Sequence, residues 1–174
     1  MIGKAEISTA QFLLRELTEE DATQRYLEWL SNPESGKFIV TAVAAQKLSD
    51  LRQYVRERAG RDDILFLGIF EKVFGLHIGN IKYEPVNSDL GYAIMGILIG
   101  DPAYRGKDVA AEVLKASAQW LKVHRNIRQI LLGVSKDNVA AVRAYEKVGF
   151  IAADMPHILK PMPMAITMVW HLEA

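Results

Sequence analysis

The chain of 174 residues contains no cysteine. Without cysteine there are no disulfide bridges, no thiolate metal ligands and no thiol nucleophile. Long apolar runs are also missing. The longest, GYAIMGILIG at 91–100, has about half of the roughly 20 residues that a membrane span needs. The N-terminal residues lack the apolar core of a signal peptide, so we expect a protein of the reducing cytoplasm.

The chain also lacks an excess of either charge, because Lys plus Arg and Asp plus Glu each number 21. No overall field therefore attracts nucleic acid or an acidic membrane, and we expect neither as a partner. The four histidines show no metal-like spacing, so we expect no metal site. The length and the apolar half of the composition fit a single domain at 1–174, as a monomer or a homodimer.

Apolar spacing along the chain predicts an alternation of strands and helices. Strands are expected at 11–17, 63–71, 74–84, 90–99, 127–135 and 164–172. Helices are expected from a capping box at Thr18–Asp21 to a stop at Asn32-Pro33, and at 48–60, 109–124 and 138–149. This order predicts an α/β fold with a mixed sheet and helices on its faces. The continuous apolar character of 90–99 predicts burial of that strand on both faces.

The connection DPAYRGKDVA at 101–110 has features of an anion site. It leads into a helix that starts near Asp108, and the unpaired N–H groups and dipole of a helix N-terminus favour an anion. Arg105 and Lys107 add positive charge, and Gly106 permits close approach of the backbone to a ligand. We therefore expect a phosphate or pyrophosphate site, the alternative being an ordinary loop with surface charges.

Two segments resemble motifs of the GCN5-related N-acetyltransferase (GNAT) superfamily. The segment RGKDVA at 105–110 lies on the pattern (Gln/Arg)-x-x-Gly-x-(Gly/Ala), except that Asp108 stands where the family has its central glycine. The segment NVAAVRAYEKVGF resembles the signature Asn-x-x-Ala-x-x-x-Tyr-x-x-x-Gly-Phe, matched by Asn138, Ala141, Tyr145, Gly149 and Phe150. The similarity covers nearly the whole chain. Residues 14–34 resemble the branch of ribosomal-protein, polyamine and amino-sugar acetyltransferases.

The resemblance implies a GNAT fold that binds acetyl-CoA as acyl donor. Its central, mostly antiparallel twisted sheet would splay between the fourth and fifth predicted strands. The backbone near Ile97, Leu98 and Ile99 would pair with the pantetheine arm. The pyrophosphate would lie over the loop and first helical turn, at Arg105, Gly106, Lys107, Asp108, Val109 and Ala110. Asn138 would orient backbone or cofactor near the splay, or serve only as a helix cap.

The resemblance also implies direct attack of an amine on the thioester, with Tyr145 protonating the departing thiolate. A phenol is protonated at neutral pH and can act as a general acid. The alternative for Tyr145 is a core tyrosine whose hydroxyl is hydrogen-bonded. Candidates for a general base near the strand ends are Glu84, Asp89 and His77, and proton removal through water without a dedicated base is equally compatible with the sequence.

The acceptor is expected to be a small amine or amino-sugar nucleotide rather than a protein N-terminus. The apolar segments at 35–46 and 153–164 are candidates for the walls of the acceptor cleft, or for loops that cover the core. Asp108 motivates two other hypotheses, namely a non-catalytic acyl-CoA-binding or regulatory module, and a degenerate relative that binds no CoA. The acid would place negative charge beside the pyrophosphate, and we expect its side chain to turn away from the phosphates.

Overall fold

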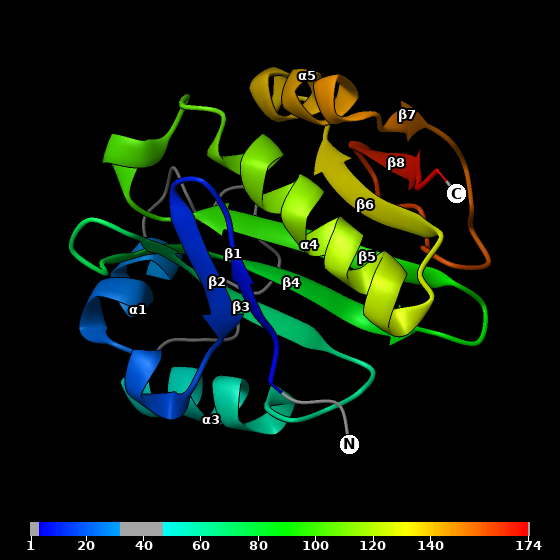
Figure 1. The fold of residues 1–174 in the computed structure, drawn as a ribbon. Coiled ribbons are helices and arrows are strands. Elements are labelled where there is room, and N and C mark those ends of the chain that lie inside the picture. The colour runs from blue at the N-terminus through cyan, green and yellow to red at the C-terminus, as the bar shows by residue number, and fades with distance from the viewer. Residues whose placement is uncertain (1–3, 32–46, 174) are drawn as a thin grey trace.

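The computed structural model describes residues 4–31 and 47–173, which form an eight-stranded sheet with helices on both faces (Figure 1). The spatial order of the strands is β1-β2-β3-β4-β5-β6-β8-β7. All neighbouring strands are antiparallel except β5 and β6, which are parallel. The strands are β1 (Glu6–Ser8), β2 (Phe12–Glu16), β3 (Leu65–Glu71), β4 (His77–Asn87), β5 (Tyr92–Ile99), β6 (Gln129–Ser135), β7 (Ile151–Ala152) and β8 (Ala165–His171). The predicted mixed sheet is confirmed.

The helices divide the core into two apolar layers. They are α1 (Gln24–Ser31), α3 (Leu48–Arg58), α4 (Val109–Arg125) and α5 (Val139–Val148). One layer joins α4 and α5 to the sheet and includes the fully buried Leu67, Ile81 and Leu114. The other joins α1 and α3 to the opposite face and includes Trp29 and Phe66. Figure 1 shows α4 running across its face of the sheet, with α5 at the top of the view above the N-terminal half of α4.

The predicted capping box is present, but it starts a different element. Thr18 N–H donates to Asp21 Oδ2 at 2.7 Å, yet the helix that follows is a single 3-10 turn at Glu19–Asp21. The α-helix begins only at Gln24, because Thr23 supplies a second cap: its hydroxyl accepts from Tyr26 N–H at 3.3 Å. The expectation of one helix from Thr18 was therefore wrong at its start.

The prediction that the 90–99 strand is buried on both faces was also wrong. Ala93 and Met95 are buried under α4, whereas Gly96 is exposed on the other face. A Cβ built on Gly96 would meet no atom within 4 Å. The apolar run thus covers one layer of the core and leaves the second face open in the middle of the strand.

Other differences concern the boundaries of elements. β4 continues to Asn87, beyond Pro85, because a register shift between Tyr83 and Val86 removes the proline from the ladder. The short strands β1 and β7 have no counterpart among the predicted elements. The predicted helix stop at Asn32-Pro33 and the apolar segment at 35–46 lie outside the described residues. No helix within the described ranges is long and apolar enough to cross a membrane.

Candidate functional site

The pairing of β5 with β6 ends halfway along β5. Tyr92, Ala93 and Ile94 are in register with β6 residues 129–131, and beyond this point no further pair joins the two strands. The backbone from Met95 to Ile99 therefore faces a widening wedge, as the predicted splay requires. Because β5 and β6 are parallel, their carboxyl ends lie at the same edge of the sheet, where open α/β sheets bind ligands. Ile97, Leu98 and Ile99 all lie in the part of β5 that pairs with β4 but not with β6.

The loop that follows β5 brings the predicted anion-binding segment to the mouth of the wedge. A 3-10 turn at Pro102–Tyr104 is capped by Asp101, whose carboxylate accepts from Ala103 N–H at 2.9 Å. Gly106 then adopts a φ of 72°, and a Cβ built there would have no atom within 4 Å. The backbone at Gly106 is thus open to close approach by a ligand.

Asp108 adopts a left-handed conformation, with φ 56° and ψ 23°, directly before α4. Glycine adopts this conformation without strain, and aspartate is among the few other residues that tolerate it. The change from left-handed Asp108 to helical Val109 aligns successive N–H groups, an arrangement that binds anions. The carboxylate of Asp108 forms no cap with the helix, so its side chain does not occupy these donors.

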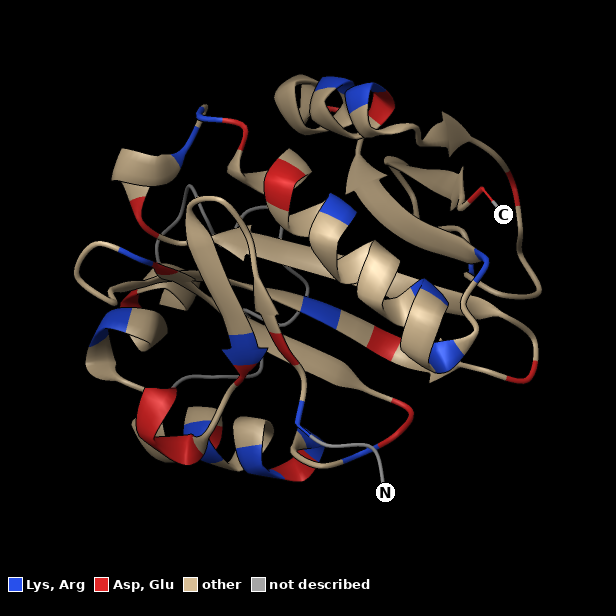
Figure 2. Ribbon diagram, viewed as in Figure 1, with Lys and Arg blue, Asp and Glu red and all other residues tan. Residues whose placement is uncertain are grey.

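The two basic side chains of the loop differ in their contacts. Arg105 Nε donates to the carbonyl of Ile99 at 3.1 Å, and its Nη2 lies 3.3 Å from the carbonyl of Gly100, so the guanidinium ties the loop to the end of β5. Lys107 is exposed, with its ammonium 6.0 Å from the ring centroid of Tyr104. Figure 2 shows both positive and negative residues on the loop before α4.

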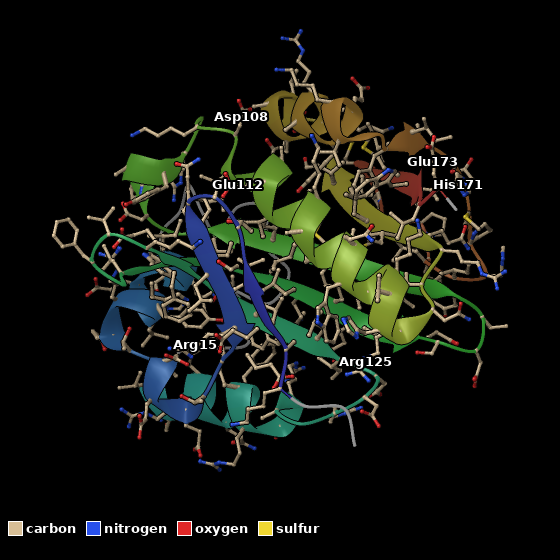
Figure 3. The ribbon with its side chains drawn as sticks, in the orientation of Figure 1. Arg15, Asp108, Glu112, Arg125, His171 and Glu173 are labelled. Atoms are coloured by element: carbon tan, nitrogen blue, oxygen red, sulfur yellow. The ribbon has the colours of Figure 1, made fainter. Side chains whose placement is uncertain are left out.

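A residue that the sequence did not single out fixes the start of α4. Glu112 lies in its first turn and accepts from the Thr9 hydroxyl at 2.6 Å, from Gln11 N–H at 3.0 Å and from Gln11 Nε2 at 3.0 Å (Figure 3). These bonds tie the helix to the turn between β1 and β2. The partners are about a hundred positions apart in the chain, so no local pattern could have indicated them.

The second motif lies on α5, at the carboxyl end of β6. Asn138 Oδ1 accepts from Ala141 N–H at 3.3 Å, which confirms the helix cap. Tyr145 packs against the apolar layer under α4, 5.7 Å from the ring of Phe150. Burial raises the pKa of Tyr145 to about 12. No group in residues 4–31 and 47–173 forms a hydrogen bond with the Tyr145 hydroxyl. Tyr145 therefore differs from the alternative stated above, a core tyrosine whose hydroxyl is hydrogen-bonded.

The candidate general bases lie in three different environments. His77 is stacked on Phe70 with centroids 4.8 Å apart, and its Nε2 lies 2.7 Å from Asn80 Oδ1. Burial lowers the pKa of His77 despite this bond. Asp89 is exposed in the turn between β4 and β5, at the end of β5 where it still pairs with β6. Asp89 is therefore remote from the opening of the wedge.

Glu84 is bound by two cations. Arg58 Nε donates to Glu84 Oε2 at 3.0 Å, and Lys82 Nζ lies 3.2 Å from the same oxygen. Burial opposes ionisation of Glu84, but the bond from Arg58 and the charge of Lys82 outweigh it, so its pKa is lowered. A carboxylate stabilised in this way is a weaker proton acceptor than a free one.

One residue of the 153–164 segment lies close to β6. A Cβ atom added to Gly133 of β6 would be 4.0 Å from Leu159 Cδ2. Two open surface hollows, near the end of α4 and between α4 and β8, include none of the predicted site residues. Within the described ranges, no group of three or more His, Cys, Asp or Glu side chains could hold a metal ion.

Comparisons with known proteins agree with this architecture. The model of the Acetyltransferase (GNAT) domain matches residues 11–151. Mycothiol acetyltransferase of Corynebacterium glutamicum (strain R) is 30% identical over 92 residues, which are 53% of this chain and 29% of that protein. The chain thus spans less than a third of the length of this curated relative.

Solved structures of low sequence identity share the fold. A GNAT-family acetyltransferase from Bacillus anthracis has a TM-score of 0.78 at 17% identity, covering 96% of this chain and 98% of its own. RimL, a ribosomal alpha-N-protein acetyltransferase in complex with coenzyme A, has a TM-score of 0.82 at 13% identity, covering 97% and 98%. A variant of spermidine N-acetyltransferase from Vibrio cholerae has a TM-score of 0.72 at 19% identity, covering 91% and 94%. With the family model matched over most of the chain, the resemblance seen in the sequence is confirmed, and this chain belongs to the GNAT acetyltransferase family.

Proposed function

We propose that the protein is an acetyl-CoA-dependent N-acetyltransferase that acts on a primary amine by direct attack. The observation that carries this proposal is the convergence at one edge of the sheet. The unpaired backbone of β5, the open N–H groups at the start of α4 and the motif of α5 all border the same wedge. Backbone groups of 97–99 are suited to pair with pantetheine as an added strand pairs with a sheet edge. The segment 105–110 is suited to hold the pyrophosphate.

In the proposed reaction the amine nitrogen attacks the thioester carbonyl carbon. A C–N bond forms, the C–S bond breaks, and the thiolate of CoA leaves. Tyr145 donates its phenolic proton to that thiolate, for which its raised pKa of about 12 keeps it protonated at neutral pH. The absence of cysteine fits this direct route, because no thiol of the protein can carry the acetyl group.

The attacking amine must also lose a proton, and we propose that water accepts it. His77 is buried among aromatic rings, Glu84 is held by two cations, and Asp89 lies at the closed end of the wedge. Each environment makes the side chain a poorer base for this step, which favours proton removal without a dedicated carboxylate or imidazole. Asn138 would support the site through the α5 cap.

The acceptor is proposed to be a small amine or amino-sugar nucleotide in preference to a protein N-terminus. The names of similar proteins include a spermidine, a ribosomal-protein and a mycothiol acetyltransferase, which agree on acetyl transfer and differ in acceptor. The N-terminal resemblance at 14–34 is what favours the small acceptor.

Thiol release from acetyl-CoA across a panel of primary amines tests the proposal. Because the chain has no cysteine, a thiol reagent reports only free CoA. We expect amine-dependent thiol release, accompanied by thermal stabilisation on addition of CoA. A ligand at a hundred times its dissociation constant stabilises the fold by about 2.7 kcal/mol. Absence of any shift at millimolar CoA would contradict CoA binding altogether.

A non-catalytic CoA-binding module is the second candidate, and Asp108 is the observation that favours it. Its carboxylate brings negative charge to the segment proposed for the pyrophosphate. The two candidates differ in turnover: the module would show the CoA-dependent shift without releasing thiol to any amine. An unpaired hydroxyl at Tyr145 supports the enzyme, since a binding module has no use for a proton donor.

A further inference from the structure

β4 presents three polar side chains to the face of the sheet that α1 and α3 cover. Asn80, Lys82 and Glu84 alternate with the buried Ile81 and Tyr83, which face α4. We call these three residues the β4 polar strip. Alternate residues on a strand are about 6.8 Å apart, so the three head groups form a row along β4. The strip lies on the face of the sheet that α3 covers, because Lys82 Nζ donates to the hydroxyl of Tyr54 on α3.

The β4 polar strip lies beside the opening between β5 and β6. Asn80 is directly opposite Leu98 on β5, and Lys82 is directly opposite Gly96. Side chains of directly opposed antiparallel residues lie on the same face. Because Gly96 is exposed and the space above it is open, Lys82 has no side chain beside it from β5.

An acceptor that reaches the wedge has to come from this face. The opposite face of β5 is filled, with Met95 buried and Ile97 and Ile99 packed into the layer under α4. Gly96 on β5 and Gly133 on β6 are exposed, and neither has a side chain to fill the gap between the strands. An amine that attacks a thioester held along β5 would therefore pass the β4 polar strip.

Two members of the strip have hydrogen-bond donors to offer. Asn80 is 4% exposed, its Oδ1 is engaged by His77 at 2.7 Å, and its Nδ2 has no partner among the described residues. Native proteins rarely leave a buried donor unpaired, and one reason to retain it is a ligand that supplies the acceptor. Lys82 has three donors, of which its contacts with Tyr54 and Glu84 use two.

We propose that the β4 polar strip recognises acceptor amines that carry a hydrogen-bond-accepting oxygen close to the amino group. The inference rests on the proposed function and narrows its substrate class. Asn80 Nδ2 and the ammonium of Lys82 donate to a carbonyl, hydroxyl or carboxylate oxygen of the acceptor. A bare polyamine has only donors and positive charge. Such an amine therefore offers no oxygen to Asn80 Nδ2 or to the ammonium of Lys82.

Matched amines and matched variants test this recognition. Alaninamide is compared with sec-butylamine, and glucosamine with cyclohexylamine. The first amine of each pair carries oxygen atoms that the second lacks, and spermidine is the polyamine. All KM values are expressed as concentrations of the neutral amine, because oxygen substituents lower the basicity of the amino group. For the wild-type protein we expect this KM to be at least about tenfold lower for the oxygen-bearing member of a pair, a difference typical of one or two hydrogen bonds. Spermidine is expected to be the poorest acceptor. The two pairs separate carbonyl from hydroxyl recognition.

Asn80→Asp removes the Nδ2 donor but keeps an oxygen for His77, and Lys82→Met removes the ammonium but keeps most of the stem. Each is expected to raise KM for the oxygen-bearing amine about tenfold, with kcat and CoA affinity nearly unchanged. Asn80→Asp is also expected to lower the melting temperature, because it introduces a carboxylate at a buried position. Asn87→Asp, on the same strand at the closed end of the wedge, and Lys115→Met, exposed on α4, are the controls.

The shift in melting temperature with CoA plus each amine measures amine binding even where turnover is slow. Thiol release with equal KM values within the pairs, or an Asn80→Asp effect that is the same for both members, overturns the inference and leaves the proposed function intact. A CoA-dependent shift with neither thiol release nor any amine-dependent shift overturns both. Loss of the CoA-dependent shift in Asn80→Asp or Lys82→Met assigns the strip to the cofactor and likewise overturns the inference.

Discussion

Under α4 a buried tyrosine of the sheet contacts a buried serine of the helix, whereas under α1 and α3 the sheet buries an asparagine. The hydroxyls of Tyr83 and Ser117 lie 2.7 Å apart, and Ser117 Oγ donates to the carbonyl of Val113 at 2.7 Å, so the hydroxyl of Tyr83 is the donor to Ser117. Asn80 instead keeps an amide donor without a partner among the described residues. The bond between Tyr83 and Ser117 on the first face favours stability. The unpaired donor and the nearby Lys82 on the second face are the two features on which the proposed acceptor recognition rests.

Tyr145 is the exception on the α4 face, and its replacement has the largest expected effect. Tyr145→Phe should lower kcat about 10²–10⁴-fold, the usual contribution of a positioned general acid, with CoA affinity and stability nearly unchanged. Stability is spared because the hydroxyl has no partner in the described residues to lose. Steady-state thiol release measures the effect. Tyr92→Phe, which removes a hydroxyl at the closed end of the wedge, is the control, and equal kcat in both variants would contradict the acid role.

Two leucines test whether the α4 face carries more of the stability. Leu114 is fully buried on α4, whereas Leu98 on β5 is partly exposed beside the wedge. Leu114→Ala should cost about 2–5 kcal/mol of unfolding free energy, as buried leucines do. Leu98→Ala should cost less, because it leaves a smaller cavity. Urea unfolding measures the loss of unfolding free energy in both variants. A larger loss for Leu98→Ala would contradict the view that the α4 face contributes more to stability.

The closed polar pair under α4 gives a smaller and more specific effect. Ser117→Ala leaves the buried hydroxyl of Tyr83 without its partner and should cost about 1–3 kcal/mol. Adding Tyr83→Phe removes that unpaired group, so the double variant is expected to be more stable than Ser117→Ala alone. Urea unfolding measures all three proteins. Additive losses would mean that the pair contributes through packing and not through its hydrogen bond.

The smallest expected effects concern Asp108. Asp108→Asn keeps the shape and tolerance of the left-handed conformation but removes the charge, and should tighten CoA binding by up to about fivefold, the factor that roughly 1 kcal/mol gives. Asp108→Gly also removes the conformational strain and should bind CoA at least as tightly as Asp108→Asn. Titration calorimetry with CoA compares them. Unchanged or weaker binding in both variants would show that the acid has another role.

Much of the fold follows from local patterns in the sequence. The strands at 65–71 and 129–135 and the helices α3, α4 and α5 lie where periodicity and caps predicted them, because each is long and has its own stop and start signals. β1 and β7 were missed, since three and two residues are too short to show a period. The left-handed backbone of Asp108 was also missed, because aspartate is favoured at caps for another reason, its side-chain oxygen.

The site was predicted less completely than the fold. Motif spacing indicated the loop at 105–110, which follows β5, and the α5 residues, which follow β6. The pairing of Asn80 with His77, the two cations on Glu84 and the attachment of Glu112 to Thr9 involve tertiary contacts or side-chain geometry that residue types do not specify. Roles in binding and catalysis for all of these residues remain predictions.

The order of the strands has a consequence for aggregation. The outer edges of the sheet are the very short β1 and β7, and short edge strands give other chains little backbone to pair with. The wedge is the exception, because the edge of β5 that faces β6 has no strand paired to it at Met95–Ile99, although its other edge pairs with β4. An extended peptide or another copy of the chain can add to this edge as readily as pantetheine can. Bound acetyl-CoA would then also prevent self-association through this edge. Protein purified without it should aggregate more, and added CoA should reduce the aggregation.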